Sequence, residues 1–216
     1  MTRRPQVLDP REHYERRMRQ FAAECVAPGG IVLLGSSHFE WFDTERHLPG
    51  LPIVNRGIAS DRLDWEGRGI LHRLDVSVFD CQPAAVVFNN GVNDLGELAR
   101  CGRPSLAQIA ANHRRVIETI RRRSPDTRLI VVNELPARGR FSAVNPLVPQ
   151  LNDRIAAAAV EFDCPLVDFY HQVVSFDGQD SAGELRAELT WDGLHLNEQG
   201  YALLAAALRP LLGNSE

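Results

Sequence analysis

Four consecutive apolar residues, Ile31 to Leu34, lead directly into Gly35, Ser36 and Ser37. An uninterrupted apolar run of this length that ends in a turn residue is typical of a strand buried on both faces of a parallel sheet. Gly35 permits a sharp turn at the end of the strand. Because ligands of open α/β sheets bind just past the carboxyl ends of the strands, Ser37 is predicted to lie at that rim.

Ser37 is also predicted to stand at the start of a helical segment. The N–H groups at the start of a helix point outward and favour negative charge, which suits a serine whose reaction creates an oxyanion. The alternative is an ordinary turn between strand and helix, in which Ser36 or Ser37 only caps the helix.

The rest of the chain alternates between strand-like and helix-like segments. Further strands are expected at 51–55, 84–88, 128–132 and 164–168, and helices at 9–22, 63–78, 105–123, 149–162 and 197–212. A short helix is expected after Ser37, and turns at 89–94, 177–182 and 190–195. This alternation predicts a single three-layer α/β/α domain of the flavodoxin-like type, with a five-stranded, mainly parallel sheet. Residues 1–30 are expected to form a helical extension packed on a main domain that spans 31–213.

The overall composition is that of an ordinary globular chain. Its 216 residues suffice for one domain with a substantial core, and its formal charge is −4. This charge gives no reason to expect nucleic acid or an anionic membrane as a partner.

The cysteines and the start of the chain bear on metal binding and location. The four cysteines have no C-x-x-C pair and no zinc-ligand spacing, so free thiols and no metal are expected. The charged first residues lead into more charge rather than an apolar signal segment, and no stretch is long enough to span a membrane. These features favour a cytoplasmic location.

Polar clusters follow several of the predicted strands and occupy the last loop. Asn55-Arg56-Gly57 follows the second strand, Asn89 to Asp94 follows the third, and Asp192 and His195 share the loop before the last helix. Asp192 and His195 are three residues apart, so one turn of chain can bring their side chains together. A carboxylate on one imidazole nitrogen leaves the other free to take a proton from Ser37. The alternative is a helix cap beside a surface histidine.

The order of these motifs resembles that of the SGNH hydrolases, also called the GDSL esterase/lipase family, from Ile31 to Leu212. Gly35-Ser36-Ser37, Asn55-Arg56-Gly57, Gly91-Val92-Asn93-Asp94 and Asp192-Gly193-Leu194-His195 match the four family blocks in order. The resemblance implies an SGNH hydrolase domain over 31–213, a Ser37–His195–Asp192 triad, and no metal or organic cofactor. It also implies an oxyanion hole formed by the N–H groups of Ser37 and Gly57 and the side-chain amide of Asn93.

The sequence departs from the family pattern on both sides of Ser37. Ser36 replaces the usual Asp, and His38 replaces an aliphatic residue. Ser36 is a competing nucleophile and His38 a candidate second base, although the side chain next to Ser37 in sequence is expected to point elsewhere. Farther on, Glu134, Arg138 and Arg140 are candidates to contact a polar alcohol group, the alternative being a solvated loop.

The sequence therefore predicts a serine esterase that acts on small-molecule or saccharide esters, with short acyl groups such as the O-acetyl groups of sugars. Two alternatives remain open. One is an acyltransferase that uses the same triad, and the other is a catalytically inert binding module with the same fold. The sequence indicates neither the oligomeric state nor which ester is used.

Overall fold

The computed structural model describes residues 9–176 and 183–213, and the turn predicted at 177–182 lies outside this range. Five strands in the described range form one parallel sheet in the order β2-β1-β3-β4-β5. They are β1 (Ile31–Gly35), β2 (Ile53–Gly57), β3 (Ala85–Asn89), β4 (Arg128–Val132) and β5 (Leu166–Val167). This is the flavodoxin-like order, so the predicted fold class is confirmed.

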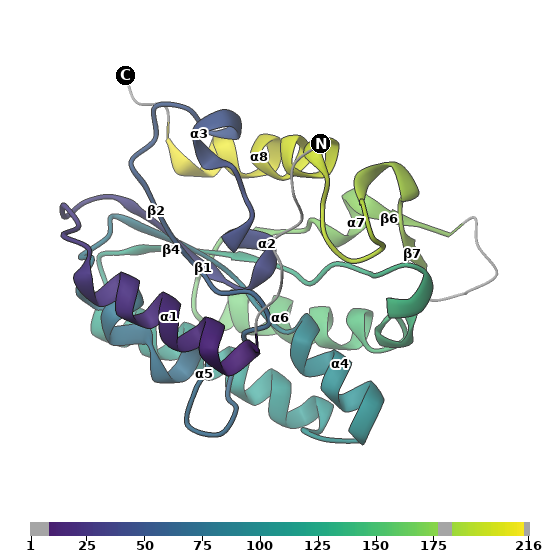
Figure 1. The fold of residues 1–216 in the computed structure, drawn as a ribbon. Coiled ribbons are helices and arrows are strands. Elements are labelled where there is room, and N and C mark those ends of the chain that lie inside the picture. The colour runs from purple at the N-terminus through teal and green to yellow at the C-terminus, as the bar shows by residue number, and fades with distance from the viewer. Residues whose placement is uncertain (1–8, 177–182, 214–216) are drawn as a thin grey trace.

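Helices cover both faces of the sheet (Figure 1). The α-helices are α1 (Pro10–Ala23), α2 (Ser37–Glu40), α3 (Thr44–His47), α4 (Val92–Cys101), α5 (Leu106–Arg123), α6 (Val148–Glu161), α7 (Tyr170–Val173) and α8 (Glu198–Leu212). Helical turns of the 3₁₀ type are η1 (Ile70–His72), η3 (Gly139–Val144) and η4 (Ala187–Leu189), and η2 (Asp75–Phe79) is a π-helical turn. Strands β6 (Val174–Ser175) and β7 (Glu184–Leu185) form a small antiparallel pair that the sequence did not predict.

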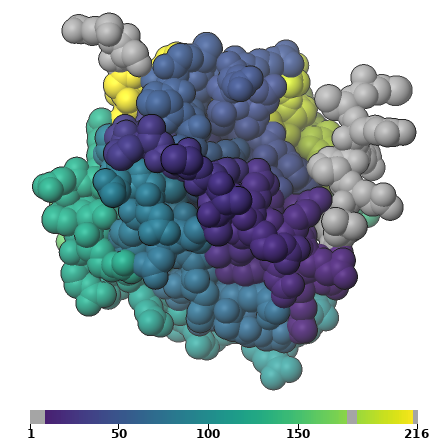
Figure 2. Space-filling model, turned by 60° about the vertical axis from the view of Figure 1, so that its left-hand side comes forward, coloured from purple at the N-terminus to yellow at the C-terminus, as the bar shows by residue number. Residues whose placement is uncertain are grey.

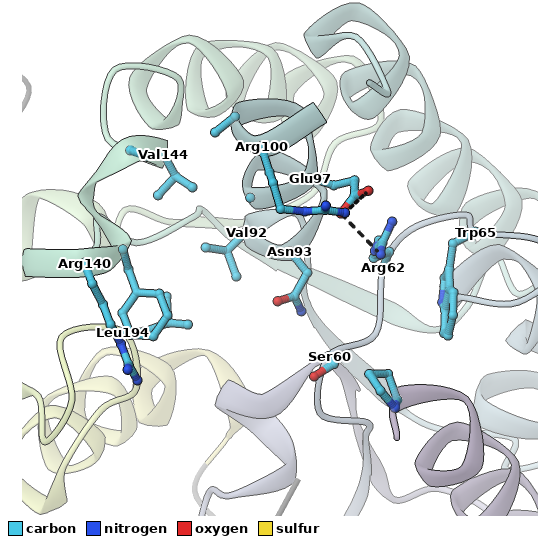
Figure 3. Close-up of a pocket in the computed structure, with 15 residues that line it drawn as sticks. Ser60, Arg62, Trp65, Val92, Asn93, Glu97, Arg100, Arg140, Val144 and Leu194 are labelled. Carbon is cyan, nitrogen blue, oxygen red and sulfur yellow. Dashed lines mark hydrogen bonds and ion pairs between the residues drawn. The ribbon is translucent and has the colours of Figure 1, made fainter. Parts of the chain in front are cut away.

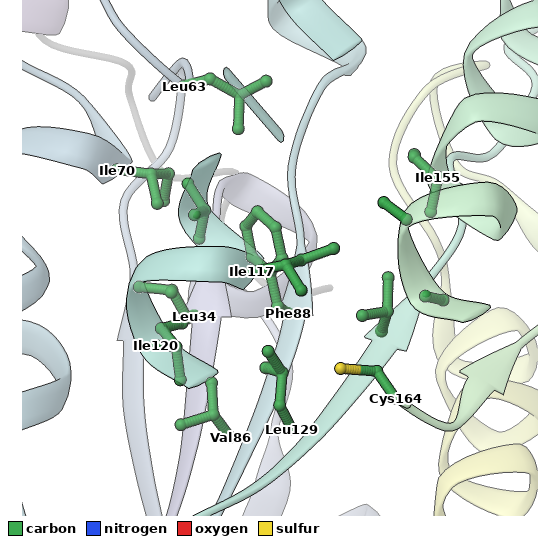
Figure 4. Packing of buried hydrophobic residues seen from close by; sticks show 14 of the residues in the cluster. Leu34, Leu63, Ile70, Val86, Phe88, Ile117, Ile120, Leu129, Ile155 and Cys164 are labelled. Carbon is green, nitrogen blue, oxygen red and sulfur yellow. The ribbon is translucent and has the colours of Figure 1, made fainter. Parts of the chain in front are cut away.

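Alternate residues of the central strands point into two cores. Val86 and Phe88 of β3 pack with Ile117 and Ile120 of α5 on one face, where α6 also contributes (Figure 4). Val87 of β3 belongs to the cluster on the other face, which includes residues of α2 and α8. Burial on both faces explains why the strands appear in the sequence as continuous apolar runs.

Helix α1 packs on the main sheet domain through a smaller apolar cluster. Tyr14 and Phe21 of α1 are buried against Ile58, which follows β2. Asp9 caps the helix by accepting hydrogen bonds from the Arg11 and Glu12 N–H groups. Figure 2 shows α1, in purple, as a band across this face of the molecule.

The predicted helix over 63–78 is wrong. Only η1 and the π-helical turn η2 form there, after a loop that contains Glu66, Gly67 and Gly69 with φ values of +49°, +76° and +105°. Positive φ values break a helix. The Leu63 N–H instead donates to Asp94 Oδ2 at 3.1 Å, which ties this loop to α4.

Helix α4 was also missed, because its first residues form the polar cluster that was predicted to be a loop. The helix begins at Val92, so Asn93 and Asp94 lie in its first turn. Its buried face includes Leu95. Asn93 is therefore held by a helix rather than by an irregular loop.

Candidate active site

Ser37 is the first residue of α2, directly after β1 and its Gly35-Ser36 turn. Asn93 lies at the start of α4, just after β3. Strands β1 and β3 are neighbours, yet the chain runs from β1 to β2 on one side before crossing to β3 on the other. The two residues thus flank the point where the strand order reverses, which is where ligands bind in doubly wound sheets.

His195, in the loop before α8, lies beside Ser37. Its Nε2 lies 3.1 Å from Ser37 Oγ, and its Nδ1 lies 2.8 Å from Asp192 Oδ2. These distances permit one hydrogen bond to each neighbour. The spatial arrangement predicted for Ser37, His195 and Asp192 is therefore present.

A compact turn of the chain holds the Asp192 carboxylate against the His195 imidazole. Asp192 Oδ1 accepts hydrogen bonds from the N–H groups of Leu194 and His195, at 3.0 and 2.8 Å. The hydroxyl of Thr190 donates to the His195 carbonyl at 2.7 Å and accepts from the Gly193 N–H at 2.9 Å. Gly193 has φ +96°, a conformation that favours glycine.

The environment keeps the imidazole neutral and the carboxylate charged. Burial lowers the pKa of His195 below its usual value, although the hydrogen bond to Asp192 acts in the opposite direction. Partial burial acts to raise the pKa of Asp192, but the hydrogen bonds from the His195 N–H, the imidazole and the Leu194 N–H hold it below the usual range. At neutral pH the pair is thus an imidazole base backed by a carboxylate.

Aromatic rings cover His195. Trp191 stacks on it with centroids 5.4 Å apart and an angle of 19°, and the Trp41 centroid is 4.2 Å away. Of the aromatic residues that follow Ser37 in the chain, Phe39 and Phe42 are core residues, whereas Trp41 is half-buried against His195. Trp191 was not singled out in the sequence, although it directly precedes Asp192.

Ser36 and His38, the two departures from the family pattern, are both buried. The Ser36 hydroxyl has no partner among the residues that the structure describes, and so has no base. His38 Nε2 lies 3.0 Å from the Leu194 carbonyl oxygen, to which it donates, and its ring centroid is 5.9 Å from that of His195. Burial lowers the pKa of His38 to about 4, so this ring is neutral. His38 thus contacts the loop that carries His195, and its Nε2 is occupied.

The candidate oxyanion donors differ in availability. In the described part of the chain, the Ser37 N–H has no acceptor, as expected for an N–H at a helix start. Asn93 Nδ2 donates to the Asp61 carbonyl at 2.8 Å, which leaves its second hydrogen free.

The expectation for Gly57 needs correction. Its N–H donates to Asn55 Oδ1 at 2.9 Å and is not available to an oxyanion. A Cβ at Gly57 would lie 2.2 Å from the Glu40 backbone nitrogen, so this glycine permits the close approach of β2 to α2. Three residues further on, Ser60 has a φ of +65°, a conformation typical of a turn. Ser60 lines a pocket with Asn93, and its N–H has no acceptor among the described residues (Figure 3).

Glu134, expected either to contact substrate or to lie in a solvated loop, does neither. It is fully buried beneath the β3–α4 turn, where Asn89 Nδ2 donates to its Oε1 at 3.2 Å. Arg138 pairs with Glu184 at 3.0 Å, and Arg140 lines the pocket beside Asn93.

Neither a metal-binding cluster nor a membrane span is found in the part of the chain that the structure describes. Within residues 9–176 and 183–213, no group of three or more His, Cys, Asp or Glu side chains is arranged to hold a metal ion. None of the helices in this range has both the length and the apolar sequence needed to cross a bilayer.

A doubly wound parallel sheet with Ser, His and Asp at its carboxyl edge is an arrangement that hydrolytic enzymes use. The model of the GDSL-like lipase/acylhydrolase family matches residues 40–203. The chain therefore belongs to this family and is an enzyme of the lipase and esterase type.

Solved structures agree with this assignment at the level of the fold. A proposed platelet activating factor from Streptococcus pneumonia has a TM-score of 0.78 and 23% identity, with 94% of each chain covered. A GDSL-like lipase from Bacteroides thetaiotaomicron has a TM-score of 0.76 and 24% identity, over 92% of this chain and 96% of that one. An acetylxylan esterase from Geobacillus stearothermophilus has a TM-score of 0.62 and 17% identity, over 88% and 97%. No curated protein matches the chain.

Proposed function

We propose that the protein hydrolyses carboxylic esters with short acyl groups, using Ser37 as nucleophile, His195 as base and Asp192 to orient His195. The observation that carries this proposal is the continuous chain of contacts from Ser37 Oγ through His195 to Asp192, at 3.1 and 2.8 Å. The lowered pKa values of His195 and of Asp192 support a neutral imidazole beside a charged carboxylate, which these roles require.

The reaction proceeds in two halves. Ser37 Oγ attacks the acyl carbonyl carbon while His195 Nε2 takes the hydroxyl proton. The tetrahedral intermediate then collapses, and His195 donates that proton to the departing alkoxide. Water, deprotonated by His195, then attacks the acyl-enzyme ester. The acyl–Oγ bond breaks, His195 returns the proton to Ser37 Oγ, and the carboxylic acid is released.

The developing negative charge needs fixed donors. We assign this role to the Ser37 N–H and the Asn93 side chain, together with the Ser60 N–H in place of that of Gly57. The support is that these groups have N–H hydrogens without an acceptor among the described residues, and that Ser60 and Asn93 line one pocket. Replacing Asn93 by Ala is expected to lower kcat by about 10²–10³, the usual effect of losing one such donor. A loss below tenfold would remove Asn93 from this role.

Saccharide O-acetyl esters are the candidate natural substrates. The support is the structural likeness to two proteins described as acetylxylan esterases, although at 17% identity each. A panel of acetyl, butyryl and longer esters, with acetylated saccharides, tests this choice.

Substitution of Ser37 tests the mechanism itself. Ser37→Ala is expected to reduce ester hydrolysis by several orders of magnitude and to abolish labelling by a fluorophosphonate probe. Ser36→Ala is the matched control, since the Ser36 hydroxyl lacks a base, and it is expected to remain labelled. Unchanged turnover by Ser37→Ala would contradict the proposal.

A product analysis with an added alcohol acceptor separates hydrolysis from acyl transfer. Release of free acid as the main product is expected. Acyl transfer to the acceptor as the main product would instead support the acyltransferase alternative, and absence of both would support an inert binding module.

A further inference from the structure

A pocket of about 500 Å³ adjoins the site on the side of Asn93. Its lining comes from the start of α1, from the loop before η1, from α4, from η3 and from Leu194, the neighbour of His195. An ester bound with its carbonyl oxygen at Asn93 would therefore extend one of its two arms into this space.

The middle of the pocket is apolar. Val92, Phe141, Val144 and Leu194 line it, and Figure 3 shows Val92 lying between the Arg140 side and the Arg62 side. Such a surface favours burial of a short carbon chain or of one face of a ring.

The polar part of the lining is basic. Three arginines, Arg62, Arg100 and Arg140, are among its lining residues, and Glu97 is the one residue with a carboxylate among them. The local formal charge is +2, three positive groups less one negative group, whereas the whole chain carries −4. The positive lining is thus a local feature and does not follow from the overall charge.

The three arginines are not equivalent. Arg100 binds both oxygens of Glu97, at 2.7 and 2.9 Å, and Arg62 lies 3.5 Å from the same carboxylate. Arg140 forms no ion pair with any residue in the described ranges, and its guanidinium lies 4.6 Å from the ring centroid of Phe141. Stacking on Phe141 limits the rotamers of Arg140 and leaves its N–H groups available to a ligand.

We propose that this pocket binds an anionic group of the ester substrate, a carboxylate or a phosphate, and that Arg140 is its direct partner. The inference rests on the proposed esterase function and adds a substrate class to it. An arginine fork pairs well with either anion, and the apolar centre accommodates the atoms between the anion and the ester carbonyl. The anion belongs either to the acyl group or to the alcohol group, and the experiment below distinguishes these two sources.

The test compares matched pairs of anionic and neutral esters. On the acyl side, the pair is mono-para-nitrophenyl succinate and para-nitrophenyl butyrate. On the alcohol side, the pair is para-acetoxybenzoate and phenyl acetate. Hydrolysis of these two esters is measured by the release of acid. The quantity measured is the ratio of kcat/KM for the anionic ester to that for the neutral ester, in the wild type, in Arg140→Gln and in Arg122→Gln. Arg122 is an exposed residue of α5 that is not part of the pocket, so its variant controls for the loss of one positive charge.

In at least one pair, the wild type is expected to prefer the anionic ester. Arg140→Gln is expected to lower the ratio about tenfold in that pair, because a charge-assisted hydrogen bond is lost. Arg122→Gln is expected to keep the ratio within about twofold, since a distant exposed charge contributes little. Added salt is expected to lower the ratio in the wild type more than in Arg140→Gln.

Failure of the anion-site proposal and failure of the esterase proposal would give different results. An unchanged ratio in Arg140→Gln, or a wild-type preference for the neutral ester in both pairs, would overturn the anion site while leaving the esterase function intact. Absence of hydrolysis of all four esters by the wild type would overturn the esterase function, and the anion site with it.

Discussion

At the scale of single residues, His195 depends on two opposing influences. Burial favours its neutral form, and the Asp192 carboxylate favours its charged form. Burial is the larger of the two, so the imidazole is available as a base at lower pH than an exposed histidine would be.

The pH profile of the reaction tests this balance. Because His195 must be neutral to accept the Ser37 proton, activity should be lost as pH falls through the pKa of His195. We expect the acid limb of kcat/KM for a neutral ester to have its midpoint below about 6.5, the usual pKa of histidine. A midpoint at or above that value would show that the Asp192 contribution exceeds that of burial.

At the scale of elements, the position of α2 against β2 fixes Ser37. The Gly57 position is so close to α2 that a Cβ would lie 2.2 Å from Glu40 N and 2.7 Å from Glu40 Cα. These are backbone atoms of the helix that begins at Ser37, so they cannot move aside without displacing the nucleophile.

Gly57→Ala is therefore expected to reduce both stability and activity. The free energy of unfolding, measured with urea, should fall by about 3 kcal/mol, as is usual for overpacking of a buried position. Gly96→Ala is the matched control, because a Cβ there meets nothing within 4 Å. Since Gly96 lies within α4, its replacement should raise the stability by about 0.5–1 kcal/mol. A Gly57→Ala protein as stable as the wild type would contradict the packing role.

At the scale of the whole molecule, two buried carboxyl groups lie beneath the site. Burial, together with the neighbouring Asp94, raises the pKa of Glu134 to about 8, and burial raises that of Asp94 to about 7. In the unfolded chain both groups titrate near pH 4. The folded protein therefore holds more protons than the unfolded chain between about pH 4 and pH 8.

This difference in bound protons predicts that the free energy of unfolding falls as pH rises from about 4 to about 8, because unfolding in that range releases protons. Glu134→Gln keeps a side-chain oxygen for Asn89 Nδ2 and removes one titrating group. Relative to this variant, the wild type should lose about 1 kcal/mol for each pH unit between pH 5 and pH 8. Urea denaturation of both proteins across this range provides the measurement. Parallel stability curves would show that Glu134 is already charged in the folded state.

Much of this protein was determined by local sequence. The apolar runs at Ile31–Leu34 and Ala85–Phe88 are typical of strands buried on both faces, and their alternation with helices predicted the parallel sheet. The Ser37, Asp192 and His195 motifs were also recognised from sequence, since each lies where a strand or a final loop ends. The Asp192–His195 contact could be foreseen because a single turn of chain forms it.

Other features were decided by the tertiary structure, because they depend on partners far away in the sequence. The segment 63–78 has helical periodicity, yet its loop is held by Asp94, more than 30 residues further along the chain. Gly57 appeared to be a donor until the packing of α2 on β2 and the Asn55 side chain gave it a different role. The arginines of the pocket come from three separate segments, and only folding brings them beside Asn93. Periodicity and motif spacing report local geometry, whereas the occupancy of an N–H group and the charge of a pocket are set by long-range contacts.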